Sequence, residues 1–295
     1  MTRRRSADDD AQTVTITHPE KVLFPQDGIT KGELAAYYQR VAPVMLPHLR
    51  QRPVTMERYP SGIAKKGFIQ KDVSKGFPAW LERINVPKHG GTVNHPLIND
   101  QRALLWLANQ NCVTPHIWNR RAPALMHPDL CVFDLDPARD EPAVLRAAAL
   151  AVRDLLAQRG LRSWVKTSGS KGFHIVAPLA TSDDADVERV AAFAHLLALE
   201  LVSRDPAHLT VAFSKADRGG RILVDTGRNS WSATFAAPYA VRPIAGAPVS
   251  APCTWEEIER GTVGPRSFHL RDLPDRIAAA GDIWATIYDQ PPALP

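Results

Sequence analysis

A short apolar segment with two acidic residues constrains the fold of this 295-residue chain more than any other feature. The segment is Leu130–Pro137 (LCVFDLDP), and its only charged residues are Asp134 and Asp136. Because successive side chains of a β-strand point to opposite faces, both carboxylates would share one face and the apolar side chains the other. Two uncompensated carboxylates on one buried face cost several kcal/mol, and a divalent cation between them would remove that cost. The alternative is a strand end whose aspartates cap a helix that begins near Glu141.

A glycine-containing loop, SGSKG, follows at residues 168–172, between two predicted strands at 163–167 and 173–177. Its glycines allow a tight turn that presents backbone N–H groups, and its lysine adds positive charge, which is typical of a phosphate site. The loop lacks the GxxxxGK[ST] pattern and no helix follows it, so a Walker-type NTPase is disfavoured. A plain hairpin with a lysine at its tip is the alternative. The candidate phosphate contacts are Ser168, Gly169, Ser170, Lys171 and His174.

Asp225 ends a second apolar segment, at residues 221–225, and is a candidate third ligand beside Asp134 and Asp136. Three carboxylates next to a phosphate-binding loop suit two-metal phosphoryl or nucleotidyl transfer. In that chemistry one ion activates the attacking hydroxyl and the other accompanies the leaving pyrophosphate. The alternative for Asp225 is a turn cap together with Thr226 and Gly227.

Composition excludes several classes of protein. Hydrophobic residues make up 44% and charged residues 23% of the chain, as in ordinary soluble globular proteins. No apolar run approaches the roughly 20 residues of a membrane helix, and the basic start of the chain is followed by no signal-peptide core. The scattered cysteines Cys112, Cys131 and Cys253 match neither a zinc spacing nor a disulfide framework, which indicates a reducing cytoplasm.

The net charge of +5 favours an anionic partner only weakly, but its distribution is more informative. Lysines interleaved with aromatic residues suit a nucleic-acid surface, where cations contact phosphates and rings stack on bases. A solvated lysine-rich face is the alternative. The first-quarter lysines are Lys21, Lys31, Lys65, Lys66, Lys71 and Lys75, and the aromatic residues are Phe68, Phe77 and Trp80.

The remaining patterns predict one compact α/β unit over residues 13–290, with a disordered tail at 1–12 and a C-terminal tail or start of a linker at 291–295. Helices are expected from a Thr30–Glu33 capping box to about Leu49, at 100–110 after an Asn99 cap, at 141–159 before a terminating Gly160, at 184–203, and within 265–288. Strands are expected at 13–17, 52–59, 67–71, within 80–98 around a glycine turn, and at 113–118, 221–225 and 234–241.

The order of these motifs resembles that of the archaeo-eukaryotic primase superfamily. The match is closer to the polymerase domain of bacterial ligase D and to stand-alone bacterial primase-polymerases. It rests on the segments HPEKVLFP (18–25), RPV (52–54), FIQK (68–71), HIWN (116–119), VFDLDP (132–137), KTSGSKG (166–172), NS (229–230) and APYAVR (237–242). The resemblance implies a primase-like α/β (α+β) fold, with central β-sheets and an RRM-like catalytic half flanked by helices.

The resemblance also implies roles for individual residues. Asp134 and Asp136 would bind two Mn²⁺ or Mg²⁺ ions, and Asp225 would complete the catalytic one. The triphosphate of an NTP or dNTP would contact the SGSKG loop, His174 and Arg242. Lys21 and Lys31 would hold the 5′-phosphate of the downstream strand at a gap. The expected template contacts are Arg58, Phe68 and Lys71, while Ile69 stands where some relatives have a second phenylalanine and predicts weaker template bending.

The resulting hypothesis is a template-dependent nucleotidyltransferase that prefers NTPs and extends a 3′-hydroxyl at gapped or broken DNA, in non-homologous end joining or related repair. We expect a monomer of the bacterial cytoplasm, associated with the nucleoid, and Ku and a DNA ligase are its candidate partners. The alternatives are a non-catalytic DNA-end-binding scaffold and a metal-dependent nuclease. A nuclease would not need the triphosphate site.

Overall fold

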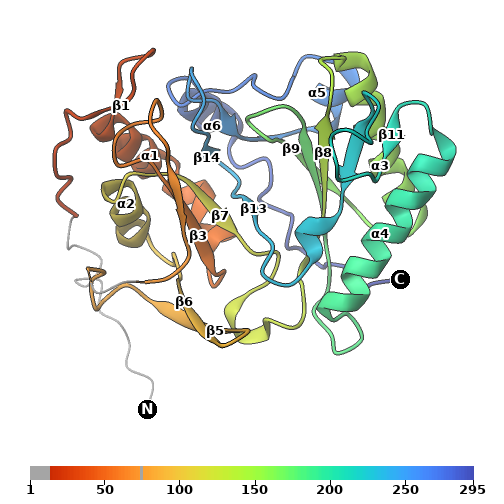
Figure 1. Cartoon of the computed structure of the whole chain (residues 1–295), viewed down its shortest axis with the longest axis horizontal. Helices are drawn as coiled ribbons and strands as arrows, with labels where there is room; N and C mark the ends of the chain where they lie inside the picture. Colours follow the sequence, from red (N-terminus) through yellow and green to blue (C-terminus); the bar gives the residue numbers. More distant parts are fainter. Residues whose placement is uncertain (1–13, 74–75) are drawn as a thin grey trace.

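The computed structural model describes residues 14–73 and 76–295, so the expected tail at 1–12 lies outside the described part of the chain. The fold is α/β, as predicted, and Figure 1 shows two halves that lie side by side. Each half contains its own main sheet and its own hydrophobic core. Within the described residues, no helix is both long and apolar enough to span a bilayer.

The first half is built on an antiparallel four-stranded sheet in the order β13-β7-β3-β4. Helix α1 begins after Thr30, whose hydroxyl accepts from the Glu33 N–H (3.2 Å) while the Glu33 carboxylate accepts from the Thr30 N–H (2.9 Å). This confirms the predicted capping box. The elements of this half are β3 (Val54–Arg58), β4 (Phe68–Gln70), β7 (Cys112–Ile117), β13 (Phe235–Ala236), α1 (Lys31–Leu49) and α2 (Gln101–Asn109).

The second half is a mixed six-stranded sheet in the order β11-β12-β8-β10-β9-β16. Helices α3 and α4 cover its outer face (Figure 1); α3 packs on β8 and β10, and α4 packs on β8 and β11. Gly160, at φ +74°, follows the end of α3 as predicted. The elements are β8 (Leu130–Pro137), β9 (Trp164–Thr167), β10 (Phe173–Pro178), β11 (Leu209–Thr210), β12 (Ile222–Asp225), β16 (Pro252–Cys253), α3 (Pro142–Gln158), α4 (Val187–Arg204) and α5 (Trp255–Arg260).

Smaller elements complete the fold. The strands expected within 80–98 form the hairpin β5–β6, and the expected C-terminal helix is α6. The segment 234–241 is not one strand but two, β13 and β14, because Tyr239 has φ +67° and the chain turns before it joins another sheet. The elements are β1 (Val22–Phe24), β2 (Ile29–Thr30), β5 (Arg83–Lys88), β6 (Gly91–Pro96), β14 (Ala240–Val241), β15 (Val249–Ser250) and α6 (Leu273–Ala280).

Two further local predictions were wrong. The described part of the expected strand at 13–17 is not a strand, since the backbone N–H of Thr17 donates to the side chain of Asn109 (2.9 Å). Helix α2 is capped by Asp100, which accepts from the N–H at the third helical position (2.8 Å). The expected cap, Asn99, instead accepts from the N–H of Gln51 (2.7 Å).

Strand β8 joins the two halves and positions the acidic pair. Leu130 and Val132 belong to the first core, while Cys131, Phe133 and Leu135 belong to the second. Both faces of the strand are therefore buried along its first part. The face that carries the two aspartates becomes accessible only toward the end of the strand, where both are partly exposed.

Candidate active site

Four polar residues form a continuous row across adjacent strands of the six-stranded sheet. Asp225 on β12 is the cross-strand partner of Asp134 on β8, which is the partner of His174 on β10. His174 is in turn the partner of Lys166 on β9. Directly opposed residues of neighbouring strands project from the same face, so the register brings two acidic and two basic side chains together.

Two arginines contact the three carboxylates. The Arg228 guanidinium lies 3.0 Å from Asp134 Oδ2 and 3.4 Å from Asp225 Oδ2, so it bridges both. Arg218 donates to Asp136 Oδ2 at 2.7 Å. Burial alone would raise the pKa of Asp134, but His174 and Arg228 outweigh it and hold that pKa well below its ordinary range. Asp134 is therefore a carboxylate at neutral pH.

The chemistry of this donor set fits a divalent metal, although its present geometry is set by the arginines. In the described parts of the chain, no three His, Cys, Asp or Glu side chains converge closely enough to hold an ion. Asp134 and Asp225 nevertheless already share one cationic group, Arg228, and both offer the hard oxygen atoms that Mg²⁺ and Mn²⁺ prefer. Asp136, two residues from Asp134 on β8, is bound to a second cationic group.

His174 is engaged on both ring nitrogens by protein groups. Its Nδ1 lies 2.8 Å from Lys166 Nζ, and its Nε2 lies 3.4 Å from Asp134 Oδ1. Lys166 is fully buried and also donates to the hydroxyl of Ser250. Burial lowers the pKa of Lys166 well below its ordinary value, and burial together with Lys166 lowers the pKa of His174 to about 4. The imidazole is thus neutral at physiological pH.

Hydrogen bonds to its own first serine, Ser168, fix the conformation of the SGSKG loop. The Ser168 hydroxyl accepts from the N–H groups of Ser170 (3.1 Å) and Gly172 (3.0 Å), and Arg242 donates to the Ser168 carbonyl (3.0 Å). Gly169 has φ +65°, and a Cβ there would lie 2.6 Å from the Arg242 side chain. A Cβ at Gly172 would meet a backbone oxygen of β8 at 1.6 Å. Only glycines allow this close approach of the loop to the acidic strand.

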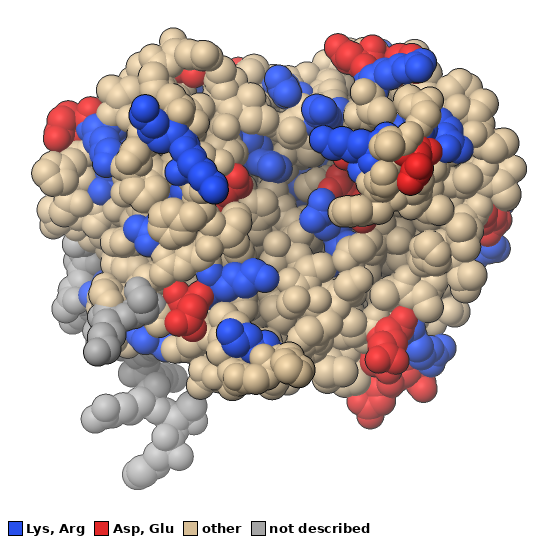
Figure 2. Space-filling view, viewed as in Figure 1, with Lys and Arg blue, Asp and Glu red and all other residues tan. Residues whose placement is uncertain are grey.

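The carboxylates and the loop line one cavity of about 310 Å³. Figure 2 shows that this face of the molecule is hollowed between the two halves and that Lys and Arg side chains border the hollow. The first half supplies His116 and Phe235 to the wall, so the site lies where the halves meet. Of the predicted residues, the cavity is lined by Asp134, Asp136, Asp225, Ser168, Ser170, Lys171, His174 and Arg242.

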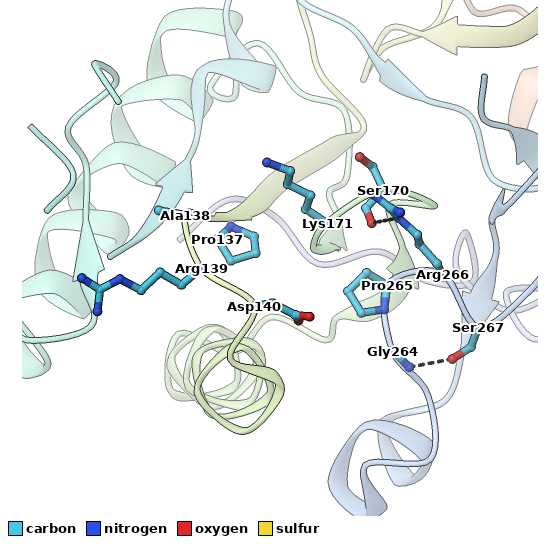
Figure 3. Close-up of a pocket in the computed structure, with 10 residues that line it drawn as sticks. All are labelled: Pro137, Ala138, Arg139, Asp140, Ser170, Lys171, Gly264, Pro265, Arg266 and Ser267. Carbon is cyan, nitrogen blue, oxygen red and sulfur yellow. Dashed lines mark hydrogen bonds between the residues drawn. The ribbon is translucent and has the colours of Figure 1, made fainter. Parts of the chain in front are cut away.

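A second cavity, of about 580 Å³, lies against the outer side of the same loop (Figure 3). Arg266 donates to the Ser170 carbonyl (2.7 Å) and fastens the 264–267 segment to the loop. Figure 3 shows Arg139 and Lys171 extending away from Pro265. Of the basic residues that line this second cavity, Arg139 and Lys171 extend away from Pro265, and Arg266 is engaged by the loop backbone.

The structure brings together the two lysines expected to hold a 5′-phosphate. The β1–β2 hairpin pairs the backbones of Lys21 and Lys31, since the Lys31 N–H donates to the Lys21 carbonyl (2.8 Å). The buried Lys31 ammonium donates to the Thr17 carbonyl (2.7 Å). Burial and repulsion from Lys21 lower the pKa of Lys31. An anion beside this pair would relieve the repulsion.

The expected template contacts cluster on β3 and β4. Arg58 is the cross-strand partner of Phe68, and its guanidinium stacks 5.3 Å from the centre of that ring. The Phe68 side chain is 46% exposed and Ile69 is 56% exposed, which leaves an open apolar surface. Lys71, just beyond the end of β4, is also exposed. Arg58 itself is held by Gln110, whose carbonyl accepts from Nε (2.7 Å).

Sequence reasoning missed four residues that complete the site. Arg228 could have been found from its i, i+3 spacing to Asp225, and Arg218 from the RGGR run before β12. Lys166 stands opposite His174 across the SGSKG hairpin, which a register argument could have found. His116, whose Nε2 lies 3.0 Å from Glu57 Oε2, and Lys166 belong to the HIWN and KTSGSKG segments, but those segments alone assign them no role.

Comparison with known proteins agrees with this geometry. Residues 30–284 match the model of the family described as "LigD, primase-polymerase domain". The chain is 34% identical over 281 residues to the Multifunctional non-homologous end joining protein LigD of Mycolicibacterium smegmatis, covering 94% of this chain and 36% of that protein. It is 28% identical to the Bifunctional non-homologous end joining protein LigD of Bacillus subtilis, covering 93% of this chain and 44% of that protein. The chain thus spans less than half the length of these relatives.

A solved structure is also similar. The polymerase domain of Mycobacterium tuberculosis ligase D in complex with DNA has a TM-score of 0.89 and 35% identity, covering 95% of this chain and all of that one. The primase-like fold and the enzyme class expected from the sequence, a nucleotidyltransferase, are those of this family. The chain belongs to the LigD primase-polymerase domain family.

Proposed function

We propose that this protein is a template-dependent nucleotidyltransferase that adds nucleotides, with a preference for NTPs, to a 3′-hydroxyl at gapped or broken DNA. The observation that carries the proposal is the placement of Asp134, Asp136 and Asp225 in one cavity with the SGSKG loop. A binding scaffold needs no set of carboxylates, and a nuclease needs no triphosphate site.

The three carboxylates would hold two Mn²⁺ or Mg²⁺ ions in place of the guanidinium groups of Arg228 and Arg218. Such ions, when bound, supply positive charge where a phosphoryl transfer develops negative charge. Arg218 and Arg228 line the same cavity, so after leaving the carboxylates they remain available to phosphate oxygens.

The triphosphate would lie against the SGSKG loop. Lys171 is exposed at its tip and Arg242 lies beneath it, so both can contact phosphate oxygens. The Ser168 hydroxyl already accepts from the N–H groups of Ser170 and Gly172, so its contribution would be to fix the shape of the loop. His174, neutral and fixed by Lys166 at Nδ1, would orient Asp134 through Nε2 and would reach a phosphate oxygen only in place of that carboxylate.

The DNA would cross both halves. Lys21 and Lys31 would bind the 5′-phosphate of the downstream strand, and Phe68, with Arg58 behind it, would stack on the template. Lys71 would contact the template backbone. The ligase D structure similar to this chain contains DNA, and the names of the long relatives place them in non-homologous end joining, which supports a role of this chain in that pathway with Ku and a ligase as partners.

A primer-extension assay with a 5′-phosphorylated gap, Mn²⁺ and labelled NTPs or dNTPs tests the proposal. The wild-type chain should extend the primer according to the template, and faster with NTPs. Asp136→Ala should abolish extension yet bind the gapped DNA as the wild type does. Asp140→Ala, an exposed acidic residue outside the cavity, is the matched control and should extend normally. Binding without extension by the wild type would favour the scaffold, and shortening of the primer would favour the nuclease.

A further inference from the structure

Next to the Asp134–Asp225 pair, a buried asparagine side chain makes the hydrogen bonds that a neighbouring strand would otherwise make with the backbone of β8. Asn229 is fully buried at the end of the short 3-10 helix η3 (Gly227–Asn229). Its Oδ1 accepts from the Val132 N–H (2.8 Å), and its Nδ2 donates to the Val132 carbonyl (2.8 Å). The same Nδ2 donates to the Thr226 carbonyl (2.9 Å). One carboxamide thus satisfies both backbone groups of a β8 residue.

The register of β12 and β8 explains why this matters. The ladder runs from the Ile222–Pro137 pair to the Asp225–Asp134 pair and then stops. A continued antiparallel ladder would pair Thr226 with Phe133 and then Gly227 with Val132, and a backbone would supply the Val132 hydrogen bonds. Instead the chain turns away after Asp225, and the Asn229 side chain supplies that pairing. The turn from Asp225 to Asn229 is therefore bonded to β8 at both ends. This lets Asp225 and Arg228 face Asp134 together.

A second layer of buried groups holds the same turn. Asn119 Nδ2 donates to the Leu130 carbonyl (2.9 Å) and to Asn229 Oδ1 (3.3 Å). The fully buried Arg120 donates to the carbonyls of Asn229 (3.3 Å) and Ser230 (3.0 Å), and burial lowers its pKa to about 10. Arg120 forms no ion pair within the described residues, and its costly buried charge is used in hydrogen bonds to the Asn119 side chain and to backbone carbonyls, two of which belong to this turn.

From this geometry we propose that Asn229 is a positioning residue for the metal-binding carboxylates. Its carboxamide fixes Asp225 opposite Asp134 at a spacing where one cationic group contacts both. Without it, the N–H and carbonyl of Val132 lose their partners and the turn is free to carry Asp225 away. Partners behind the ligands commonly change metal affinity by about 10- to 100-fold, because they fix the orientation of the ligand oxygens. The inference rests on the proposed function, since it concerns the same site.

Mn²⁺ binding to the protein alone, followed by the electron paramagnetic resonance signal of free Mn²⁺, tests this role without any turnover. Asn229→Ala should weaken Mn²⁺ affinity about tenfold, at the lower end of the range for such partners, and Asn119→Ala should weaken it less. Asn99→Ala is the matched control: this half-buried amide bonds Gln51 and Glu82 outside the cavity. It should lower the melting temperature but leave Mn²⁺ affinity at the wild-type value.

Wild-type Mn²⁺ affinity in both Asn229→Ala and Asn119→Ala would overturn the inference, and so would an equal loss in Asn99→Ala. If Asn229→Ala does not fold, Asn119→Ala decides alone. Failure of the proposed function is distinguishable: a wild-type chain that binds Mn²⁺ but extends no primer refutes the polymerase, while the Mn²⁺ series still decides the role of Asn229. Absence of Mn²⁺ binding in the wild type would refute both.

Discussion

Asp225 and Asp134 face each other across β12 and β8, and a single guanidinium, that of Arg228, reaches both carboxylates at 3.0–3.4 Å. The same oxygen atoms would serve a metal ion, so the arginine and the proposed metal would compete for them.

Removal of that guanidinium should therefore tighten Mn²⁺ binding. We expect Arg228→Gln to raise Mn²⁺ affinity about fivefold, in line with the ~1 kcal/mol between unit charges 4 Å apart in water. Titration calorimetry at two salt concentrations measures it. Arg221→Gln, outside the cavity, is the control. Weaker binding by Arg228→Gln would show that the guanidinium organises the carboxylates rather than competing for them.

The lysine pair of the β1–β2 hairpin should determine the preference for a 5′-phosphate. Lys21→Ala combined with Lys31→Ala should bind phosphorylated and unphosphorylated gaps equally, because the two cations expected to bind the dianion are then removed. Fluorescence anisotropy with both DNAs measures the ratio. The double variant Lys65→Ala with Lys66→Ala removes the same charge from exposed positions and should weaken both complexes alike. An unchanged preference in the Lys21–Lys31 variant would refute the assignment.

A buried ion pair links the two halves and should be costly to break. Arg52 is fully buried and donates to both oxygens of Asp129 at 2.6 Å. Asp129→Ala leaves that charge without its partner and should lower the free energy of unfolding by about 3–5 kcal/mol. Urea denaturation measures it. Arg40→Met, which breaks an exposed pair with Asp275, should cost at most about 1 kcal/mol. An equal decrease in the free energy of unfolding in Asp129→Ala and Arg40→Met would contradict this prediction.

Stability should fall as the pH is lowered below about 6.5, partly because of His95. Burial lowers the pKa of His95 below its ordinary 6.5, since the effects of the Val54 carbonyl and Asp72 do not offset it. Below pH 6.5 the unfolded chain then binds a proton that the folded chain does not, so the free energy of unfolding decreases with decreasing pH. His95→Gln should reduce the slope between pH 6.5 and 5, measured by urea denaturation. An unchanged slope would show that His95 is protonated in the fold.

None of the three thiols should react in the folded protein. Cys112, Cys131 and Cys253 are all buried, and burial raises the pKa of each; for Cys131 it reaches about 12. We expect no labelling by a thiol reagent at pH 8 until guanidinium is added, and then three labels by mass spectrometry. Rapid labelling of one cysteine in the native protein would reveal local opening around it.

The features that short-range chemistry decides could be predicted from the sequence. The Thr30 capping box, the terminating Gly160 and the alternation that puts Asp134 and Asp136 on one face depend only on neighbouring residues. Placement of Asp225 beside Asp134 was inferred from motif order, and the observed register brings them together.

Features that depend on distant segments could not be predicted. The Asn99 cap failed because Gln51, remote in the sequence, competes for the same side chain. Likewise, the pairing of Arg218 with Asp136 spans 82 positions, and no local pattern marks it. The local sequence shows Lys166 only as a lysine in a strand. The neighbouring strands of the sheet bury it beside His174.

Strand β8 contributes alternate side chains to two separate hydrophobic cores. Dividing the gene just before or just after this strand would therefore yield two fragments. Each would expose part of a hydrophobic core, and in neither would β8 have both of its packing partners. We expect such fragments to complement each other only when co-expressed, so the halves seen in the structure are not modules that recombination could exchange singly.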